Sequence, residues 1–354
     1  MKIIHVIPYF GIGGAETMCE TLVTTLASKG HDVIAISLYA TRSEITERME
    51  KAGIDVRYLD KKSGFDFSIR KKLKQIFNQE KPDVVHTHLY VGKYVFPVAK
   101  KCGVKKIVHT VHSVAQKELG RIDQIISKHY YKKHRVIPVA LSETVRETIE
   151  SVYSLAKSDI PVVFNGVNLT KCIKKDNYEK GETFSIVHVG RFQEVKNHEG
   201  LVEAFEKFHN KYANSELILI GYGVRQTAIE EMVKAKNLQE SVKFLGKKAE
   251  VYEFLHNADL FCLPSHYEGI PMSIIEAMGT GLPIVATNVG GIPDMVDDSC
   301  AILTPVDSEE IANAIERYYL SDELRRSHGE SAIKMVQRFS SVVMADNYLE
   351  VYGE

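Results

Sequence analysis

Two glutamates in the C-terminal half of the chain have a spacing that could carry chemistry. Glu268 and Glu276 lie within Pro264–Thr280, which reads PSHYEGIPMSIIEAMGT. An apolar run ends before this segment, a loop holds Glu268, and Pro271 suits the first position of a helix. At 1.5 Å per residue, Glu276 lies about 7.5 Å farther along that helix than Pro271.

This arrangement predicts a site for a phosphorylated sugar. The N-terminus of a helix offers backbone N–H groups and a partial positive charge, and both of these hold phosphate. Two carboxylates beside an anion repel it unless they accept hydrogen bonds from hydroxyl groups, and sugars supply such hydroxyls. On spacing alone, an exposed loop glutamate followed by a surface helix glutamate is the alternative interpretation.

Two cations occupy a comparable position earlier in the chain. Arg191 and Lys196 follow the apolar run Phe184–Val189, on a loop that begins at Gly190. Arginine binds phosphate through its planar fork and lysine as a point charge, so the pair suits a pyrophosphate. Basic residues on a loop are also often plain solvated surface, and the sequence leaves that alternative open.

A glycine-rich turn follows the first apolar run. Residues Gly11–Glu16 read GIGGAE and open a helical pattern, where glycines let the backbone approach a phosphate. Glu16 stands where a dinucleotide-binding fingerprint requires its third glycine, which argues against a nicotinamide-dependent oxidoreductase. A tight strand-to-helix turn without a ligand is the alternative interpretation.

Short apolar runs alternate with helical patterns along the whole chain, which predicts parallel sheets covered by helices on both faces. The expected strands are 2–7, 32–38, 83–87, 106–110 and 135–141, followed by 184–189, 216–220, 242–245, 260–263 and 283–286. In such α/β sheets, ligands bind at the carboxyl ends of the strands, so the loops that follow strands are where the site is expected.

The polar, lysine-rich stretch 168–183 predicts a linker between two domains. We expect one Rossmann-like domain over residues 1–170 and a second over residues 171–338. The last segment, residues 339–354, is expected to form a helix that packs back on the N-terminal domain.

Composition restricts the class of protein. Hydrophobic residues make up 44% and charged residues 26% of the 354, which is typical of a soluble globular chain. The 5 cysteines are scattered without a C-x-x-C pair, so we expect a reducing compartment and no structural zinc. No apolar stretch approaches the roughly 20 residues that span a bilayer, and no signal peptide is recognisable. These features predict a cytoplasmic protein.

The net charge of −1 conceals an asymmetry, because residues 1–170 contain 26 Lys and Arg against 17 Asp and Glu. Within residues 67–77, apolar residues recur at helical spacing: Ile69, Leu73, Ile76 and Phe77. Two interpretations stay equally open, a basic amphipathic helix resting on an anionic membrane surface and an ordinary surface helix with a solvated basic face. No nucleic-acid-binding module is recognisable, so no nucleic-acid partner is expected.

Together these fragments resemble glycosyltransferase family 4, whose members are retaining enzymes of the GT-B fold. Glu268 and Glu276 match the E-x7-E signature of that family. The other matching fragments follow in order along nearly the whole chain: Gly13–Glu16, Asn165–Val167, Gly190–Lys196, Ser265–Gly269 and Glu276–Thr287. The resemblance implies two Rossmann-like domains that face a cleft, with the acceptor on the N-terminal side and the nucleotide sugar on the C-terminal side.

The resemblance also implies a role for each site residue. Glu276 would bind the nucleotide ribose, Arg191 and Lys196 the diphosphate, and Glu268 the hydroxyls of the donor sugar. His112 would lie near the sugar C6 hydroxyl and the reacting centre, so the implied catalytic set is Glu268, His112, Arg191 and Lys196. The further donor-binding residues would be Gly13, Gly14, Gly190, Leu245, Gly269, Ile270, Pro271 and Met272.

The expected activity is transfer of a sugar from a nucleotide sugar, with UDP preferred, to a glycan or lipid-linked acceptor. Such a reaction belongs to the synthesis of bacterial-type surface polysaccharide or glycolipid, with peripheral contact to the inner face of the membrane. A nucleotide-sugar epimerase of the same fold and a non-catalytic glycan- or nucleotide-sugar-binding protein are the alternatives.

Four histidines could imitate a metal cluster: His86, His88, His109 and His112. No acidic ligand accompanies them, and two of them fall within expected buried strands. The chain also lacks the D-x-D pair that holds metal in the other main glycosyltransferase fold. We therefore expect a metal-independent reaction that uses no cofactor.

Overall fold

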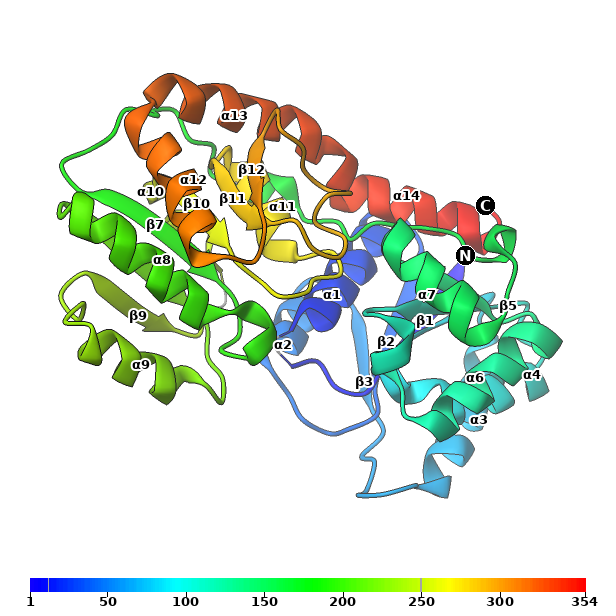
Figure 1. The fold of residues 1–354 in the computed structure, drawn as a ribbon. Coiled ribbons are helices and arrows are strands. Elements are labelled where there is room, and N and C mark those ends of the chain that lie inside the picture. Colours follow the sequence, from blue (N-terminus) through cyan, green and yellow to red (C-terminus); the bar gives the residue numbers. More distant parts are fainter. Residues whose placement is uncertain (12, 249) are drawn as a thin grey trace. The chain divides into compact units, whose positions relative to one another are not determined.

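The computed structural model describes residues 1–354 except residues 12 and 249 (Figure 1). The chain divides into two compact units, one formed by Met1–Val167 with Ser341–Glu354 and the other by Asn168–Ser340. Each unit contains a parallel six-stranded sheet with helices packed on it. The predicted α/β class with two parallel sheets is therefore confirmed.

The strands of the first unit pair in the order β3-β2-β1-β4-β5-β6. Their bounds are β1 Lys2–Ile7, β2 Asp32–Ser37, β3 Asp55–Tyr58, β4 Val84–His88, β5 Lys106–Val111 and β6 Ile137–Ala140. The sequence predicted all of them except β3. That strand lies at the sheet edge and is only partly buried, so its sequence DVRY lacks the apolar run by which the others were recognised.

The strands of the second unit pair in the order β12-β11-β10-β7-β8-β9. Their bounds are β7 Phe184–Val189, β8 Ser215–Ile220, β9 Val242–Gly246, β10 Leu260–Leu263, β11 Ile284–Thr287 and β12 Ala301–Thr304. Only β12 was not predicted. Both sheets have the doubly wound order, which reverses direction between the first and fourth strands. The reversal lies between β1 and β4 in the first unit and between β7 and β10 in the second.

Helices connect the strands in both units. Those of the first unit are α1 Gly14–Ser28, α2 Glu44–Lys51, α3 Phe67–Glu80, α4 Gly92–Lys101, α5 Ala115–Glu118, α6 Arg121–His134, α7 Glu143–Tyr153 and α14 Ser341–Tyr352. Those of the second are α8 His198–Lys211, α9 Gln226–Ala235, α10 Tyr252–Asn257, α11 Met272–Thr280, α12 Ser308–Leu320 and α13 Asp322–Met335. Short 3-10 turns lie at Leu89–Val91, Lys157–Asp159, Leu169–Lys171, Glu194–Lys196 and Val336–Phe339. None of the helices in the described ranges is long and apolar enough to cross a bilayer.

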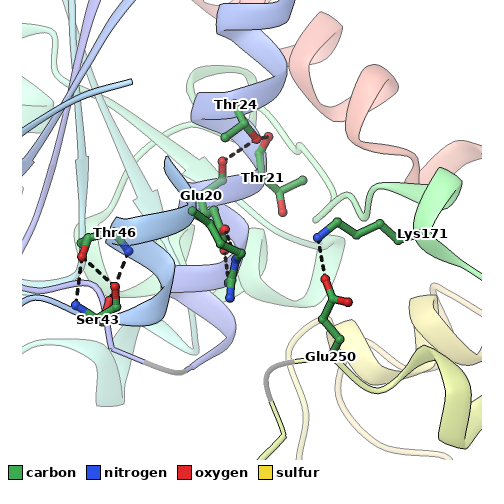
Figure 2. Close-up of polar contacts among 8 residues, drawn as sticks. Glu20, Thr21, Thr24, Ser43, Thr46, Lys171 and Glu250 are labelled. Carbon is green, nitrogen blue, oxygen red and sulfur yellow. Dashed lines mark hydrogen bonds and ion pairs between the residues drawn. The ribbon is translucent and has the colours of Figure 1, made fainter. Parts of the chain in front are cut away.

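Local side-chain contacts fix where several helices begin. Figure 2 shows the start of α2, where the Ser43 hydroxyl accepts from Thr46 N and the Thr46 hydroxyl accepts from Ser43 N. Such a reciprocal cap satisfies two backbone donors that the first helical turn leaves unpaired. The same helix is tied to α1 by Arg48, which donates from Nε and Nη2 to the Glu20 carboxylate at 2.7 and 2.8 Å.

The C-terminal helix α14 belongs to the first unit and packs against α1. Figure 1 shows α14 in red along the blue α1. Two tyrosines of α14 reach into the core of the unit, where the Tyr352 hydroxyl lies 2.7 Å from His86 Nδ1 and the Tyr348 hydroxyl 2.7 Å from Thr110 Oγ1. The last helix therefore contributes side chains to the same core as β4 and β5.

The stretch 168–183, which the sequence predicts as a linker between two domains, begins where the two units divide and packs on the second unit. Lys175 donates from its backbone N–H to Thr280 O at 2.8 Å and from Nζ to Ala258 O at 2.6 Å. The buried Arg325 donates from Nε to Tyr178 O at 3.0 Å. Lys175 thus satisfies backbone carbonyls of the second unit, and the Tyr178 carbonyl satisfies the buried Arg325. The polar composition of the stretch did not indicate these contacts.

Candidate functional site

Two of the predicted motifs meet where the strand order of the second unit reverses. Arg191 and Lys196 follow β7, Glu268 follows β10, and these two strands are neighbours in the sheet. Their loops are tied together, because His266 N donates to Val195 O at 2.8 Å and Asn197 Nδ2 donates to Pro264 O at 3.0 Å. A reversal of strand order is where doubly wound sheets bind ligands.

Lys196 and Glu268 form an ion pair at this point. Lys196 Nζ lies 2.6 Å from Glu268 Oε1, and the Ser265 hydroxyl donates to the same oxygen at 2.6 Å. Both side chains are largely buried, with 17% of the lysine and 10% of the glutamate exposed. Among the described residues, Oε2 of Glu268 receives no such bond. The pair joins a cation that follows β7 to a carboxylate that follows β10.

The loop that carries Glu268 rests on a glycine pair that the sequence analysis did not single out. Gly291 N donates to Glu268 O at 3.1 Å. A Cβ atom on Gly290 would overlap Glu268 O, and a Cβ atom on Gly291 would overlap Gly269 O. Gly290 also adopts a φ of 55°, which favours glycine. Two consecutive glycines, separated from the predicted strand 283–286 by residues 287–289, were the signal that could have identified this support.

The helix that follows the loop begins without a side-chain cap. Pro271 is the N-cap and α11 begins at Met272, one residue later than predicted, because ψ of Pro271 is 118° and therefore extended. Pro271 makes no capping hydrogen bond. The predicted residues Gly269 and Ile270 lie in the preceding loop, with Ile270 buried. The first turn of α11 thus presents backbone donors of the kind that bind phosphate.

Glu276 lies about one turn into α11 and is half-buried. Burial raises the pKa of its carboxyl to about 7, against the smaller opposing effect of Lys171. The hydrogen bonds among the described residues do not connect its carboxylate with Glu268, Arg191 or Lys196. The two glutamates therefore occupy different environments, one ion-paired and the other desolvated.

The loops after β7, β8 and β9 support one another. Gly190 N donates to Ile220 O at 2.9 Å, and Gly221 N donates to Gly246 O at 3.0 Å. A Cβ atom on Gly221 would overlap Gly190 O, so the backbones approach more closely than a side chain permits. Leu245 lies next to this contact at the end of β9, and Arg191 is exposed. The guanidinium has no hydrogen bond with the residues that the structure describes.

The glycine turn of the first unit leads into α1. Gly13 is the N-cap and α1 begins at Gly14, while Ile12 lies outside the described residues. Among the described residues, and apart from its chain neighbours and the helix's own backbone, no atom lies within 4 Å of the position that a Cβ would take on Gly14. Glu16 is buried in the first turn of the helix.

His112 follows β5 in the first unit and is half-buried. Its Nε2 lies 3.0 Å from His88 Nδ1, and its backbone N–H donates to Glu118 Oε1 at 2.8 Å. Burial lowers the pKa of His112 to about 3 and raises that of Glu118 to about 8. The sequence analysis missed Glu118, which nothing in its surrounding sequence distinguishes from a surface residue.

Comparison with known proteins identifies the family. The model for glycosyl transferases group 1 matches residues 171–335, and the model for Glycosyltransferase Family 4 matches residues 12–171. This chain is a group 1 glycosyltransferase. The GT-B fold and the family resemblance inferred from the sequence are thereby confirmed.

The glycosyltransferase is similar to proteins of known activity over most of its length. It is 25% identical to N-acetyl-alpha-D-glucosaminyl L-malate synthase of Bacillus anthracis over 366 aligned residues, which cover 97% of this chain and 94% of that relative. It is 27% identical to UDP-Gal:alpha-D-GlcNAc-diphosphoundecaprenol alpha-1,3-galactosyltransferase of Escherichia coli, over 79% of this chain and 77% of that enzyme. The crystal structure of Anabaena HepE in complex with UDP has the same fold, with a TM-score of 0.82, 19% identity and 99% coverage of both chains.

The histidine cluster of the glycosyltransferase differs in membership from the predicted one. The ring nitrogens that lie within 4.8 Å of one another belong to His5, His86 and His88, all fully buried. Both nitrogens of His86 are hydrogen-bonded, to Tyr352 and Thr110, and both nitrogens of His88 are bonded to other histidines. His109 instead bonds Thr87 at 2.8 Å. A metal ion at this cluster would have to replace those hydrogen bonds.

Proposed function

We propose that this glycosyltransferase transfers a hexose from a UDP-sugar to a glycan or lipid-linked acceptor, with retention of anomeric configuration. The observation that carries the proposal is the Lys196–Glu268 ion pair beside the uncapped start of α11. Support for UDP comes from HepE, whose crystal structure holds UDP, and from the Escherichia coli relative, whose name specifies UDP-Gal. The latter name also specifies a lipid-linked diphosphate acceptor.

In this proposal the residues after β7 and β10 bind the two ends of the donor. Arg191, Lys196 and the backbone amides of α11 hold the diphosphate, because each offers positive charge or N–H donors. Glu276 accepts from the ribose hydroxyls, and Glu268 accepts from sugar hydroxyls through Oε2. The remaining donor contacts on the second unit use backbone groups of Gly190, Leu245 and Gly269–Met272.

Catalysis would rest mainly on the departing diphosphate. Negative charge builds on that group as the bond to the sugar breaks, and preorganised donors lower the barrier by stabilising it. Lys196 is the cation best placed for this role, since its ammonium is already ordered by Glu268. Glu268 is held by two donors on Oε1, which favours a hydroxyl-binding role over nucleophilic attack. We therefore favour front-face transfer, in which a diphosphate oxygen helps to deprotonate the acceptor.

A screen of donors tests this function directly. Thermal shift with UDP-, GDP- and ADP-sugars identifies the preferred nucleotide, and we expect UDP-sugars to stabilise most. Incubation of the best donor with candidate acceptors, followed by NMR of the product, then gives the anomeric configuration. An inverted product or a covalent sugar on Glu268 in an intact mass spectrum contradicts the mechanism. Conversion of the donor sugar without any acceptor indicates an epimerase instead.

A lipid-linked acceptor would bring the protein into contact with a membrane. The burial of residues on α3 decides which part of this helix could take part in that contact. Ile69, Leu73 and Phe77 pack in the core, so the apolar stripe of this helix does not face lipid. Two exposed aromatics remain at its start, Phe65 with 47% and Phe67 with 74% exposed. Exposed lysines follow on the same helix, and this combination suits an anionic bilayer on the cytoplasmic face.

Vesicle flotation tests this contact. We expect vesicles that contain phosphatidylglycerol to carry the protein upward at low salt, with less binding at high salt, because the electrostatic part is screened. Phe67→Ser should weaken the binding, whereas Val224→Ser, which changes a 94% exposed residue of the second unit, should not. Equal flotation of both variants contradicts the proposed contact.

A further inference from the structure

Three imidazole rings form a hydrogen-bonded chain inside the first unit. His112 Nε2 lies 3.0 Å from His88 Nδ1, and His88 Nε2 lies 3.1 Å from His5 Nδ1. His88 and His5 are fully buried on the neighbouring strands β4 and β1, and only His112 is partly exposed. The chain therefore runs from the core to the loop after β5.

All three rings are neutral near pH 7. Burial lowers the pKa of His5 and of His112 to about 3, and it lowers the pKa of His88 well below its ordinary value. A neutral imidazole donates from one nitrogen and accepts at the other. Both nitrogens of His88 take part in hydrogen bonds, one as the donor and the other as the acceptor. The protons of the three-ring chain can therefore point only inward, toward His5, or outward, toward His112. Either direction fixes which nitrogen of each ring carries the proton.

The inner end of the chain decides between the two directions. His5 Nε2 is buried and has no hydrogen-bond partner in the part of the chain that the structure describes. If protons pointed inward, this nitrogen would carry an unpaired N–H, and a buried donor without a partner is destabilising. If the protons point outward, His5 Nε2 carries no proton and is only an acceptor without a partner. Buried acceptors without a partner are less rare in proteins than buried N–H groups without one. The outward direction is therefore favoured.

In the outward direction His5 Nδ1–H donates to His88 Nε2, and His88 Nδ1–H donates to His112 Nε2. We infer that His5 and His88 hold His112 as its Nδ1–H tautomer, so that His112 presents a hydrogen-bond donor to a ligand at the end of β5. His88 is then a positioning residue that acts through His112. This inference rests on the proposed function only for the identity of the ligand, a sugar hydroxyl.

The fixed tautomer has a consequence for the reaction. A nitrogen that already carries a proton cannot accept one, and the other nitrogen of His112 is engaged by His88. His112 therefore acts as a hydrogen-bond donor that orients a hydroxyl oxygen, and it does not act as a general base. Donors with an oxygen at the contacted position are preferred over their deoxy analogues.

NMR of the free protein with ¹⁵N-labelled histidine tests the tautomer without any substrate. Correlation of ring protons with ring nitrogens distinguishes the two tautomers, and the His112→Ala spectrum assigns the signals. We expect a protonated Nδ1 and an unprotonated Nε2 on His112 at pH 7. A protonated Nε2 on the wild-type ring overturns the inference, whether or not a donor has been identified.

Two variants test the role of His88. His88→Phe keeps a ring but removes the donor to His112, so we expect His112 to gain the Nε2–H form. We also expect kcat/KM for the preferred donor to fall about tenfold, which corresponds to one lost hydrogen bond of about 1.4 kcal/mol. The same change should be small for a deoxy donor that lacks the contacted hydroxyl.

His109→Phe is the matched control, because His109 is equally buried but bonds Thr87 and is outside the three-ring chain. It should leave the His112 tautomer unchanged. An unchanged tautomer in His88→Phe, or equal losses for both donors, overturns the role of His88. If no donor supports turnover, the proposed function fails while the wild-type NMR result still decides the tautomer.

Discussion

Substitution of Glu276 by glutamine should stabilise the free protein in a pH-dependent way. Burial raises the pKa of this carboxyl to about 7 from an ordinary value of 4.5. The folded state therefore binds the proton more tightly than the unfolded state does. The favourable effect of that proton is fully present below pH 4.5, is lost as the pH rises toward 7, and stays lost above 7.

The size of the effect follows from the same two values. At 1.36 kcal/mol per pH unit, the difference between the folded and unfolded pKa corresponds to an upper limit of about 3 kcal/mol. Water that reaches the half-buried carboxyl reduces this value, so we expect about 2 kcal/mol for Glu276→Gln at pH 8. For a domain of this size, that raises Tm by about 4–8 °C. At pH 5 the gain should fall below about 1 kcal/mol.

Thermal unfolding at pH 5 and pH 8, without and with UDP, is the assay. We expect the glutamine variant to exceed the wild type in Tm at pH 8 without UDP and to be stabilised less by UDP. Glu253→Gln, a change on the neighbouring helix α10 at an exposed position, serves as the control and should shift Tm little at either pH. A gain of the same size at both pH values refutes the reasoning, because it would not arise from ionisation.

Three further substitutions have defined outcomes. Lys196→Ala should lower kcat by about 100- to 1,000-fold, as expected for loss of a charge-stabilising group, whereas Lys207→Ala, which breaks an exposed ion pair, should not change it. Gly291→Ala should displace the loop that carries Glu268, so we expect lower kcat/KM and lower Tm in steady-state and melting measurements. Tyr352→Phe should cost about 1–2 kcal/mol in chemical denaturation, because it leaves His86 Nδ1 without its partner; an unchanged midpoint contradicts this role.

The sequence was sufficient to predict most of the strands and the α/β class. Strands such as β7 and β10 are buried on both faces, so they read as continuous apolar runs between polar loops. The edge strand β3 was missed because half-exposed residues carry no such run. The contacts of the stretch 168–183 were not predictable for a related reason, since Lys175 satisfies backbone carbonyls that only the folded chain brings near it.

The residues of the candidate site could be named from the sequence, but the contacts among them could not. Arg191, Lys196 and Glu268 could be placed after two strands, yet the ion pair depends on those strands being neighbours, which the order of β7 and β10 decides. The support from Gly291 depends likewise on β11 lying beside β10. The buried imidazole chain was not predicted, because the sequence grouped His88 and His112 with His86 and His109, and spacing alone does not reveal that both nitrogens of His88 are hydrogen-bonded.

The central claim is that the second unit binds a UDP-sugar through Arg191 and Lys196. Isothermal titration of UDP into the wild type and into the Arg191→Ala/Lys196→Ala double variant tests it most directly, with circular dichroism to verify that the variant is folded. We predict saturable binding by the wild type and at least a tenfold weaker affinity for the variant. Equal affinity of the two proteins for UDP would contradict the account.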